Sequence, residues 1–306
     1  MIQRELAAGL LAGAALFVQL SPYLGQPLPQ LAPERFAPGL VSTDAIELNA
    51  VFTPDLQEVF FARWVDGVPG LFHAERIRGA WTPSRPLPLF PTDRGTVAVD
   101  MMVSYDGTEL VFLGTHPHPD DNGKPTGDIW RSRRVNGKWA TAEVIPAPVS
   151  TGASEGYPTM VGDGSLYFTS DRPGGPGRSN LYRAQRQQDR SFASPVLVPP
   201  PISTAQGIGD VFVAKDESYL VFSSRRPPGL GNGDLFVSFR RPDGGWGEPA
   251  HLGHGINTAF TDFCPMVTPD GKYFFFSRRH GATWAEATAG DVYWMDAKVL
   301  DAYRKQ

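Results

Sequence analysis

The sequence feature that most constrains the fold is a unit of roughly fifty residues that occurs five times. Each copy has an acidic residue, a short β-strand-like run, a turn built around an Asp and a second, aromatic run. The copies span residues 47–63, 100–115, 155–172, 210–225 and 262–278. A repeat of this length that holds several strands is typical of a β-propeller, in which each unit forms one blade.

The remainder of each unit supplies two more short strands. A third strand follows the aromatic run, as in residues 234–236, and a fourth follows a Gly-Trp turn, as at Gly245-Trp246. The units close on a Thr at positions 43, 92, 151, 204 and 258. Four strands joined by tight turns make one blade, so we predict an all-β, five-bladed propeller of four-stranded antiparallel blades.

The two ends of the chain complement each other in this repeat. The fifth copy stops after its third strand, at residues 291–295, while residues 35–43 match the fourth-strand closings at 144–151 and 251–258. We therefore predict that the N-terminal strand closes the last blade, because an open sheet edge is prone to aggregation. No unassigned stretch is long enough for a sixth blade.

The sequence divides into four segments: residues 1–25, 26–35, 36–296 and 297–306. The first contains the apolar run 7–18 and is interpreted as a signal peptide, because the run is too short to span a bilayer. The alternative is an N-terminal hydrophobic helix docked on the propeller. The second is a Pro-rich lead-in, the third is the propeller and the last is a short helix or tail.

The net charge and the cysteine content limit the kinds of partner and cross-link that the chain can have. The net charge of −4 argues against a nucleic-acid partner, which favours a basic patch. The single cysteine, Cys264, excludes an internal disulfide framework and is interpreted as a small buried side chain. We expect a monomer with no membrane span in the mature chain.

The repeat resembles the TolB-type β-propeller repeat, which is distantly related to the Trp-Asp (WD) repeats. The resemblance is carried most specifically by residues 222–226, 231–236, 245–249 and 255–258 and extends from about residue 35 to 296. It implies a propeller and a bacterial periplasmic or secreted protein; a docked N-terminal helix would instead indicate a cytoplasmic one. Such repeats serve scaffolds, binding modules and enzymes, so the resemblance leaves the function open.

The acids that open the innermost strands are the candidate site. Counted back from the turn Asp of each copy, Glu47, Glu155 and Asp262 stand eight residues earlier, and Asp100 and Asp210 six residues earlier. Because side chains alternate with period two along a strand, these offsets predict that all five carboxylates face the central channel. The predicted ligand-binding residues are Glu47, Asn49, Asp100, Met102, Glu155, Tyr157, Asp210, Phe212 and Asp262.

A ring of carboxylates is suited to a cation. We expect Ca²⁺ or another divalent cation, with Asp100, Asp210 and Asp262 as metal ligands, because close carboxylates repel one another unless a cation balances them. The alternative is that the acids hydrogen-bond backbone N–H groups in the loops between blades.

Two functions remain open from the sequence. The first is a ligand- or protein-binding module that holds a protein, peptide, small molecule or glycan at the channel mouth. The second is an enzyme, such as a glycoside hydrolase, lyase or cyclase, in which Glu47, Asp100 and Glu155 supply the acid and base.

Overall fold

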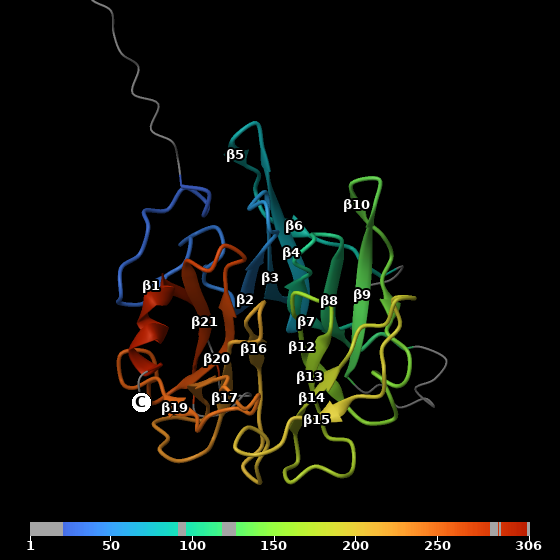
Figure 1. Cartoon of the computed structure of the whole chain (residues 1–306). Coiled ribbons are helices and arrows are strands. Elements are labelled where there is room, and N and C mark those ends of the chain that lie inside the picture. Colours follow the sequence, from blue (N-terminus) through green and yellow to red (C-terminus); the bar gives the residue numbers. More distant parts are fainter. Residues whose placement is uncertain (1–20, 91–95, 118–126, 282–286, 288, 305–306) are drawn as a thin grey trace, which may run out of the picture.

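The five repeats form five antiparallel sheets arranged around one axis (Figure 1). The structure is a computed structural model of the chain and describes residues 21–90, 96–117, 127–281, 287 and 289–304. The predicted all-β, five-bladed propeller is confirmed. Most of the predicted signal peptide, residues 1–20, lies outside the described residues.

The blades follow one another along the chain. Blade 1 contains β2 (Glu47–Phe52), β3 (Glu58–Val65), β4 (Val68–Ile77), β5 (Ala80–Trp81) and β6 (Arg85–Pro86). Blade 2 contains β7 (Ala98–Val103), β8 (Glu109–Gly114), β9 (Asp128–Val135), β10 (Lys138–Trp139) and β11 (Glu143–Val144). Blade 3 contains β12 (Glu155–Met160), β13 (Leu166–Ser170), β14 (Asn180–Ala184) and β15 (Val196–Leu197). Blade 4 contains β16 (Val211–Val213), β17 (Tyr219–Ser224), β18 (Asp234–Phe239) and β19 (Ala250–His251). Blade 5 contains β20 (Thr261–Val267), β21 (Tyr273–His280), β22 (Ala289–Asp296) and β1 (Glu34–Arg35).

The innermost strand of each blade contacts the innermost strands of its two neighbours. The order around the ring is β2, β7, β12, β16 and β20, and β20 returns to contact β2. Strands β2, β7, β12 and β20 each read as a nearly continuous run of buried residues, because both of their faces are covered by neighbouring sheets. The channel that the inner strands surround is therefore narrow.

The N-terminal segment completes the last blade, as predicted. β1 pairs antiparallel with β22, with Glu34 opposite Trp294. The pairing continues past the strand, since the Phe36 N–H donates to the Val292 carbonyl at 2.8 Å. In Figure 1 the blue start and the red end of the described chain lie side by side at this blade. The N-terminal segment thus covers the edge of β22 from Val292 to Asp296, where the Asp296 N–H also donates to the Gln30 carbonyl.

An aromatic cluster holds the closure together. Phe36 is fully buried and packs edge-to-face against Phe275 and Trp294, with ring centroids 4.9 and 5.1 Å apart. Tyr23 packs against Phe52 of blade 1 in the same cluster, and its hydroxyl donates to Asp270 at 2.9 Å. Burial of aromatic side chains between elements of distant sequence supplies much of the stabilisation of such a core.

The turn that joins the first two strands of a blade is held by an Asp and a hydroxyl. In blade 2 the Ser104 hydroxyl donates to Asp106 at 2.6 Å, and the Thr108 N–H donates to the same carboxylate at 3.0 Å. Hydrogen bonds of this kind hold the pKa of Asp106 below its ordinary value. The turn Asp is thus a local fold determinant, as are its equivalents Asp163, Asp216 and Asp270, whose pKa values are also lowered.

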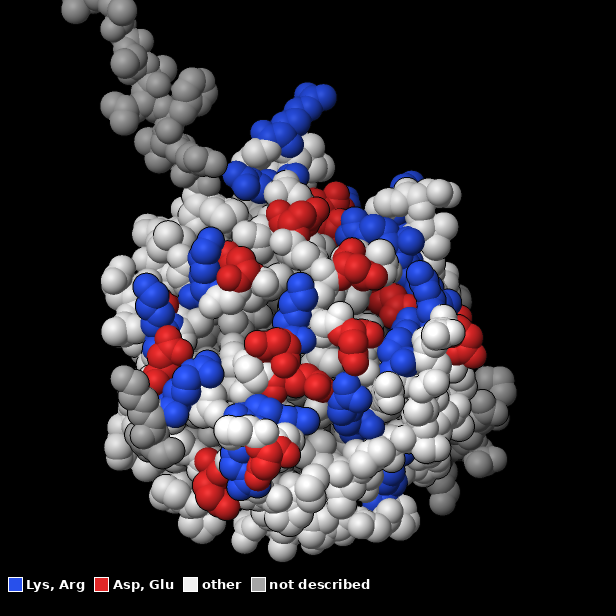
Figure 2. Space-filling model, in the orientation of Figure 1, with Lys and Arg blue, Asp and Glu red and all other residues white. Residues whose placement is uncertain are grey.

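After β22 the chain forms a 3₁₀ helix, η1 (Ala297–Tyr303). The Asp296 side chain caps it by accepting from the Lys298 N–H, and the Tyr303 hydroxyl donates to the Leu252 carbonyl of the adjacent blade. Among the described residues, no helix has the length and apolar character needed to cross a membrane. On the face in view in Figure 2, Lys and Arg side chains are interspersed with Asp and Glu.

Replacing Phe36 with Ala tests the closure. We expect F36A to lower the free energy of unfolding by about 3–5 kcal/mol, because the change leaves a cavity between β22 and blade 1. Urea denaturation followed by tryptophan fluorescence measures the loss. The control is Leu31→Ala, since Leu31 lies in the same segment but is 60% exposed, and we expect it to cost no more than about 0.5 kcal/mol.

The turn aspartates predict a pH dependence. A carboxyl whose pKa is lowered in the folded state stabilises the fold above its unfolded pKa and loses that contribution as the pH falls through the folded pKa. Asp106→Asn should therefore destabilise the protein near neutral pH, and the difference from wild type should shrink below about pH 4. Urea denaturation across this pH range measures the difference, and a gap that stays constant would contradict the role of the ionised carboxylate.

Candidate functional site

One residue from each blade meets at the channel, and we call these five residues the central ring. The central ring consists of Asn49, Asp100, Tyr157, Asp210 and Cys264, and each stands six residues before the turn Asp or its equivalent. Together they line a cavity of about 10 Å³ inside the channel. That volume is close to what one water-sized sphere requires.

A backbone bulge occurs at four of these five residues. Asn49, Asp100, Tyr157 and Cys264 have left-handed φ angles of 55°, 55°, 50° and 48°. In each of these blades the register between the first two strands shifts across this residue. A bulge interrupts the alternation of side chains along a strand. Two residues that are two positions apart, such as Glu47 and Asn49, therefore do not point to the same side when the bulge lies between them.

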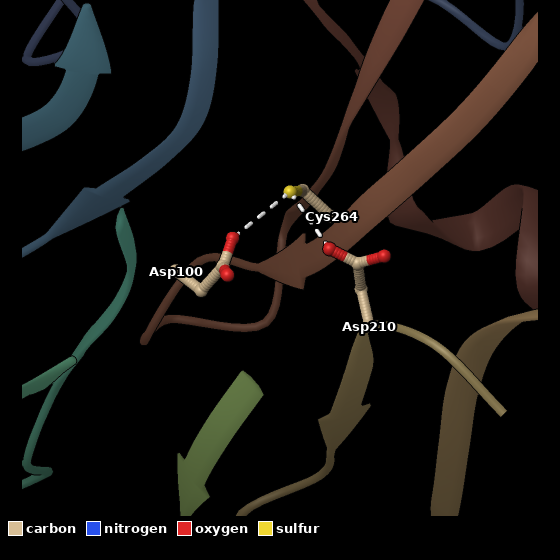
Figure 3. Close-up of side chains that lie close together, drawn as sticks. All are labelled: Asp100, Asp210 and Cys264. Carbon is tan, nitrogen blue, oxygen red and sulfur yellow. Dashed lines mark hydrogen bonds between the residues drawn. The ribbon is translucent and has the colours of Figure 1, made fainter. Parts of the chain in front are cut away.

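Two carboxylates and the thiol are in direct contact within the central ring (Figure 3). The Cys264 thiol donates to Asp210 Oδ1 at 3.0 Å and to Asp100 Oδ1 at 3.5 Å. One ligand atom from each of the three residues can be chosen so that all lie within 4.8 Å of one another. The Ser223 hydroxyl donates to the other Asp210 oxygen at 3.0 Å. This is a buried group of side chains that bind metals in other proteins.

The electrostatics of the central ring favour neutral forms in the absence of a cation. Burial and the neighbouring Asp210 raise the pKa of Asp100 well above its ordinary value. Burial also raises the pKa of Asp210, while the hydrogen bond from Cys264 opposes that change. The Cys264 thiol has its pKa raised by burial and by both carboxylates. The Asp210 charge and burial likewise raise the pKa of Tyr157.

The prediction that all five acids face the channel is wrong for three of them. Glu155 is fully buried, accepts from Arg172 at 3.0 Å and also accepts from the Thr151 N–H and hydroxyl. The corresponding groups in blades 1 and 5 are Glu47 with Arg63 and Thr43, and Asp262 with Arg278 and Thr258. These acids make the interblade hydrogen bonds that the sequence offered as the alternative.

The arginine in each of these groups also ties the blade to the preceding closing loop. Arg172 donates to the Val149 carbonyl at 2.6 Å, and Arg278 donates to the Ile256 carbonyl at 2.7 Å. In blade 4 the equivalent Arg226 donates to the Ile202 carbonyl, but Ile208 stands where blades 1, 3 and 5 carry the acid. Burial lowers the pKa of Arg226. The ion pair is therefore a structural feature of blades 1, 3 and 5, and blades 2 and 4 carry Ala98 and Ile208 at the position of the acid.

Two other predicted wall residues lie outside the central ring. Met102 and Phe212 stand two residues beyond the ring position of their blades and are buried in the hydrophobic core. Asp262, predicted as a metal ligand, is paired with Arg278, and Cys264 takes its place beside Asp100 and Asp210. The offset from the turn Asp is the sequence signal that separates the two sets: it is eight residues for the paired acids and six for Asp100 and Asp210.

A larger cavity opens at the channel mouth above the central ring, and we call it the mouth cavity. It has a volume of about 450 Å³ and lies over the starts of β12, β16 and β20. Tyr157 and Asp210 line both this cavity and the smaller one in the channel. The other polar lining residues include Asp171, Arg178, Gln206, Arg225, Asn232, Thr261 and Arg279. Burial lowers the pKa of Arg279 to about 10.

Comparison with known proteins identifies the fold. No family model and no curated protein sequence matches the chain. A protein of Agrobacterium tumefaciens assigned as a TolB is 11% identical, with a TM-score of 0.51 over 83% of this chain and 91% of that one. TolB from Acinetobacter baumannii is 13% identical with a TM-score of 0.48, and the 83% of this chain that aligns spans 57% of its length. The chain therefore has a β-propeller fold similar to that of the Agrobacterium tumefaciens protein.

The same comparison includes an enzyme. A thermostable family-43 glycoside hydrolase is 14% identical and superposes with a TM-score of 0.54, over 84% of this chain and 91% of that one. At such identities the likeness concerns the fold alone, and propellers of one shape serve both binding and catalysis. The choice between these functions therefore depends on the residues of the site.

The two kinds of acid predict opposite effects of mutation. Glu155→Gln should lower the free energy of unfolding by about 3 kcal/mol, because Arg172 loses its charged partner inside the protein. Asp100→Asn should not destabilise the fold, because it removes one of two carboxyls that repel each other. Urea denaturation of both variants in chelator-containing buffer makes the comparison. Equal losses would mean that Asp100 has the same structural role as Glu155.

Proposed function

We propose that the protein is a ligand-binding propeller module and that its ligand occupies the mouth cavity. The observation that supports this is the size and lining of that cavity: about 450 Å³, with polar side chains from three consecutive blades converging on it. Small-molecule sites commonly have volumes of 300–1,000 Å³ and a few converging polar groups. The ligand is thus a glycan, a short peptide or the tip of a protein segment.

The charges at the mouth favour a ligand with an anionic group. Arg178 and Arg225 are exposed at the cavity, and the Arg225 guanidinium is held in place because it donates to the Asn232 carbonyl at 2.8 Å. Asp171 is also exposed there, but its carboxylate accepts from the Ser154 N–H at 2.8 Å. Asp210 lies deeper, and burial raises its pKa. An arginine at a cavity rim can bind a carboxylate with two hydrogen bonds.

The glycoside hydrolase alternative is less well supported. Two of its three candidate residues, Glu47 and Glu155, are fully buried and paired with arginines, so they are not positioned to act on a substrate. The third candidate, Asp100, lies with Asp210 beside a cavity of about 10 Å³. A glycosidase holds the scissile bond of its substrate between two carboxyl groups, and a cavity of that size does not hold a sugar. We therefore propose binding without hydrolysis.

We further propose that the protein works in the periplasm or outside the cell. The support is the apolar run 7–18 near the first Met, which is typical of a signal peptide. Removal of residues 1–25 would take away Tyr23, whose ring is 2% exposed within the closure cluster. We therefore propose that the leader ends before Tyr23, and N-terminal sequencing of protein recovered from the producing cell would locate the cleavage point.

Ligand binding at the mouth can be tested with probes that differ in one charge. We expect uronic-acid oligosaccharides or short peptides with a free C-terminal carboxylate to raise the melting temperature, and their neutral or amidated analogues to have a smaller effect. For any probe that binds, Arg225→Ala should cost about 1.5–3 kcal/mol of binding free energy, measured by calorimetry.

The matched control is Arg241→Ala. Arg241 lies on the outer hairpin of the same blade, is 52% exposed and does not line the mouth cavity. This variant should bind with wild-type affinity. If neither Arg225→Ala nor Arg178→Ala changes the affinity for the probe, the ligand binds elsewhere and the proposal is wrong.

A further inference from the structure

The small cavity in the channel collects four potential metal ligands from four different blades. Asn49 comes from blade 1, Asp100 from blade 2, Asp210 from the residue before β16 in blade 4, and Cys264 from blade 5. Figure 3 shows the two carboxylates and the thiol turned toward one another. All four side chains are at least nine-tenths buried. The repeat itself brings these side chains together, since each occupies the same position of its blade.

Asn49 provides an observation independent of the acids. Its side-chain oxygen, Oδ1, is buried and has no hydrogen-bond partner among the described residues. Asn49 is 5% exposed and lines the same 10 Å³ cavity as the carboxylates. A buried amide oxygen without a partner is unfavourable and rare in folded proteins. Because an amide oxygen is also a metal ligand, a cation in the cavity would satisfy it.

The acids of the central ring also lack the partners that the other acids have. Glu47, Glu155 and Asp262 each form an ion pair with an arginine at 2.7–3.0 Å. Within the described part of the chain, no Lys, Arg or His forms such a pair with Asp100 or Asp210, which accept hydrogen bonds from Cys264 and, for Asp210, from Ser223. A buried pair of carboxyls without a countercharge is expected either to hold a proton or to hold a cation.

The thiol determines which cation fits. Ca²⁺ takes six to eight oxygen ligands, whereas Zn²⁺ is bound by four ligands drawn from Cys sulfur, carboxylate oxygen and other donors. Thiolate ligands favour zinc-class ions over Ca²⁺ and Mg²⁺. We propose that the central ring binds one Zn²⁺ ion through Asp100, Asp210 and Cys264, with Asn49 Oδ1 as the fourth ligand. Binding would release the thiol proton and any proton on the carboxyls.

The mouth cavity supplies a route for the ion, because Asp210 and Tyr157 line both cavities. The zinc site does not depend on the proposed ligand of the mouth cavity. Either can be present without the other, and their tests use different residues.

The first experiment measures metal content and affinity. The full chain without an affinity tag is stripped with a chelator, incubated with Zn²⁺, desalted and analysed for bound metal. We expect one Zn²⁺ per chain and a higher melting temperature with Zn²⁺ than with chelator. Cys264→Ser should weaken Zn²⁺ binding at least about tenfold. A wild-type protein that retains no Zn²⁺, or that takes up Ca²⁺ in its place, would overturn the proposal.

The second experiment identifies the ligands with Co²⁺ as a spectroscopic substitute. A cobalt–thiolate bond gives a charge-transfer absorption in the near ultraviolet, which we expect in wild type and not in Cys264→Ser. Asp100→Asn keeps the thiol and should weaken Co²⁺ binding while circular dichroism stays that of the folded protein. This second variant keeps the test decisive if Cys264→Ser does not fold.

The matched control is Asp171→Asn, which removes an exposed carboxylate of the mouth cavity and leaves the central ring unchanged. It should bind Zn²⁺ and Co²⁺ as wild type does. Loss of metal in this variant, with retention in Asp100→Asn, would show that the ion binds at the mouth and would overturn the assignment to the central ring.

Discussion

The structure depends on the pairing of its first strand with its last. Without β1, the edge of β22 would have no hydrogen-bonding partner, and the cluster around Phe36 and Trp294 would be open. The paired residues are more than 250 positions apart in the chain, so all five blades lie within the loop that this contact closes. The central ring has a defined diameter only because the sheets are held in a closed circle.

Much of the fold was predictable from the sequence because the blade is a local unit that recurs. Three sequence features reflect contacts made within one repeat: the turn Asp with its Ser or Thr, the aromatic second strand and the Gly-Trp turn. The closure was predictable for the same reason, since residues 35–43 match the fourth-strand closings of complete copies. The start of the propeller near Tyr23 was not predictable in this way. Tyr23 contacts Phe52 and Asp270, which lie in blades 1 and 5, and no sequence pattern around residue 23 indicates these contacts.

The candidate site was predictable only in part. The sequence pointed to Asp100 and Asp210, and these two carboxylates do meet in the channel. It also grouped them with Glu47, Glu155 and Asp262, because alternation along an ideal strand places offsets of six and eight on one face. The left-handed residue in four of the five blades breaks that alternation. Cys264 was assigned to packing because its carboxylate neighbours come from other blades, which spacing within one repeat cannot reveal.

Repetition also has a functional side. Equivalent positions of the five blades carry four kinds of side chain, so the central ring combines an amide, two carboxylates, a phenol and a thiol in one small space. The ion-paired acids cannot vary so freely, because each neutralises an arginine that binds a neighbouring loop. Blade 4 tolerates Ile208 in that place while keeping the contacts of Arg226 to the loop carbonyls.

Tyr157 and Asp210 form the floor of one cavity and the wall of the other. A change in the charge or position of the Asp210 carboxylate in the channel would therefore also change the lining of the mouth cavity. Thermodynamic linkage makes that influence mutual: whatever factor an occupant below imposes on affinity above, the occupant above imposes on affinity below. The shared Asp210 carboxylate would thus link the affinities of the two proposed sites, although each site can form without the other.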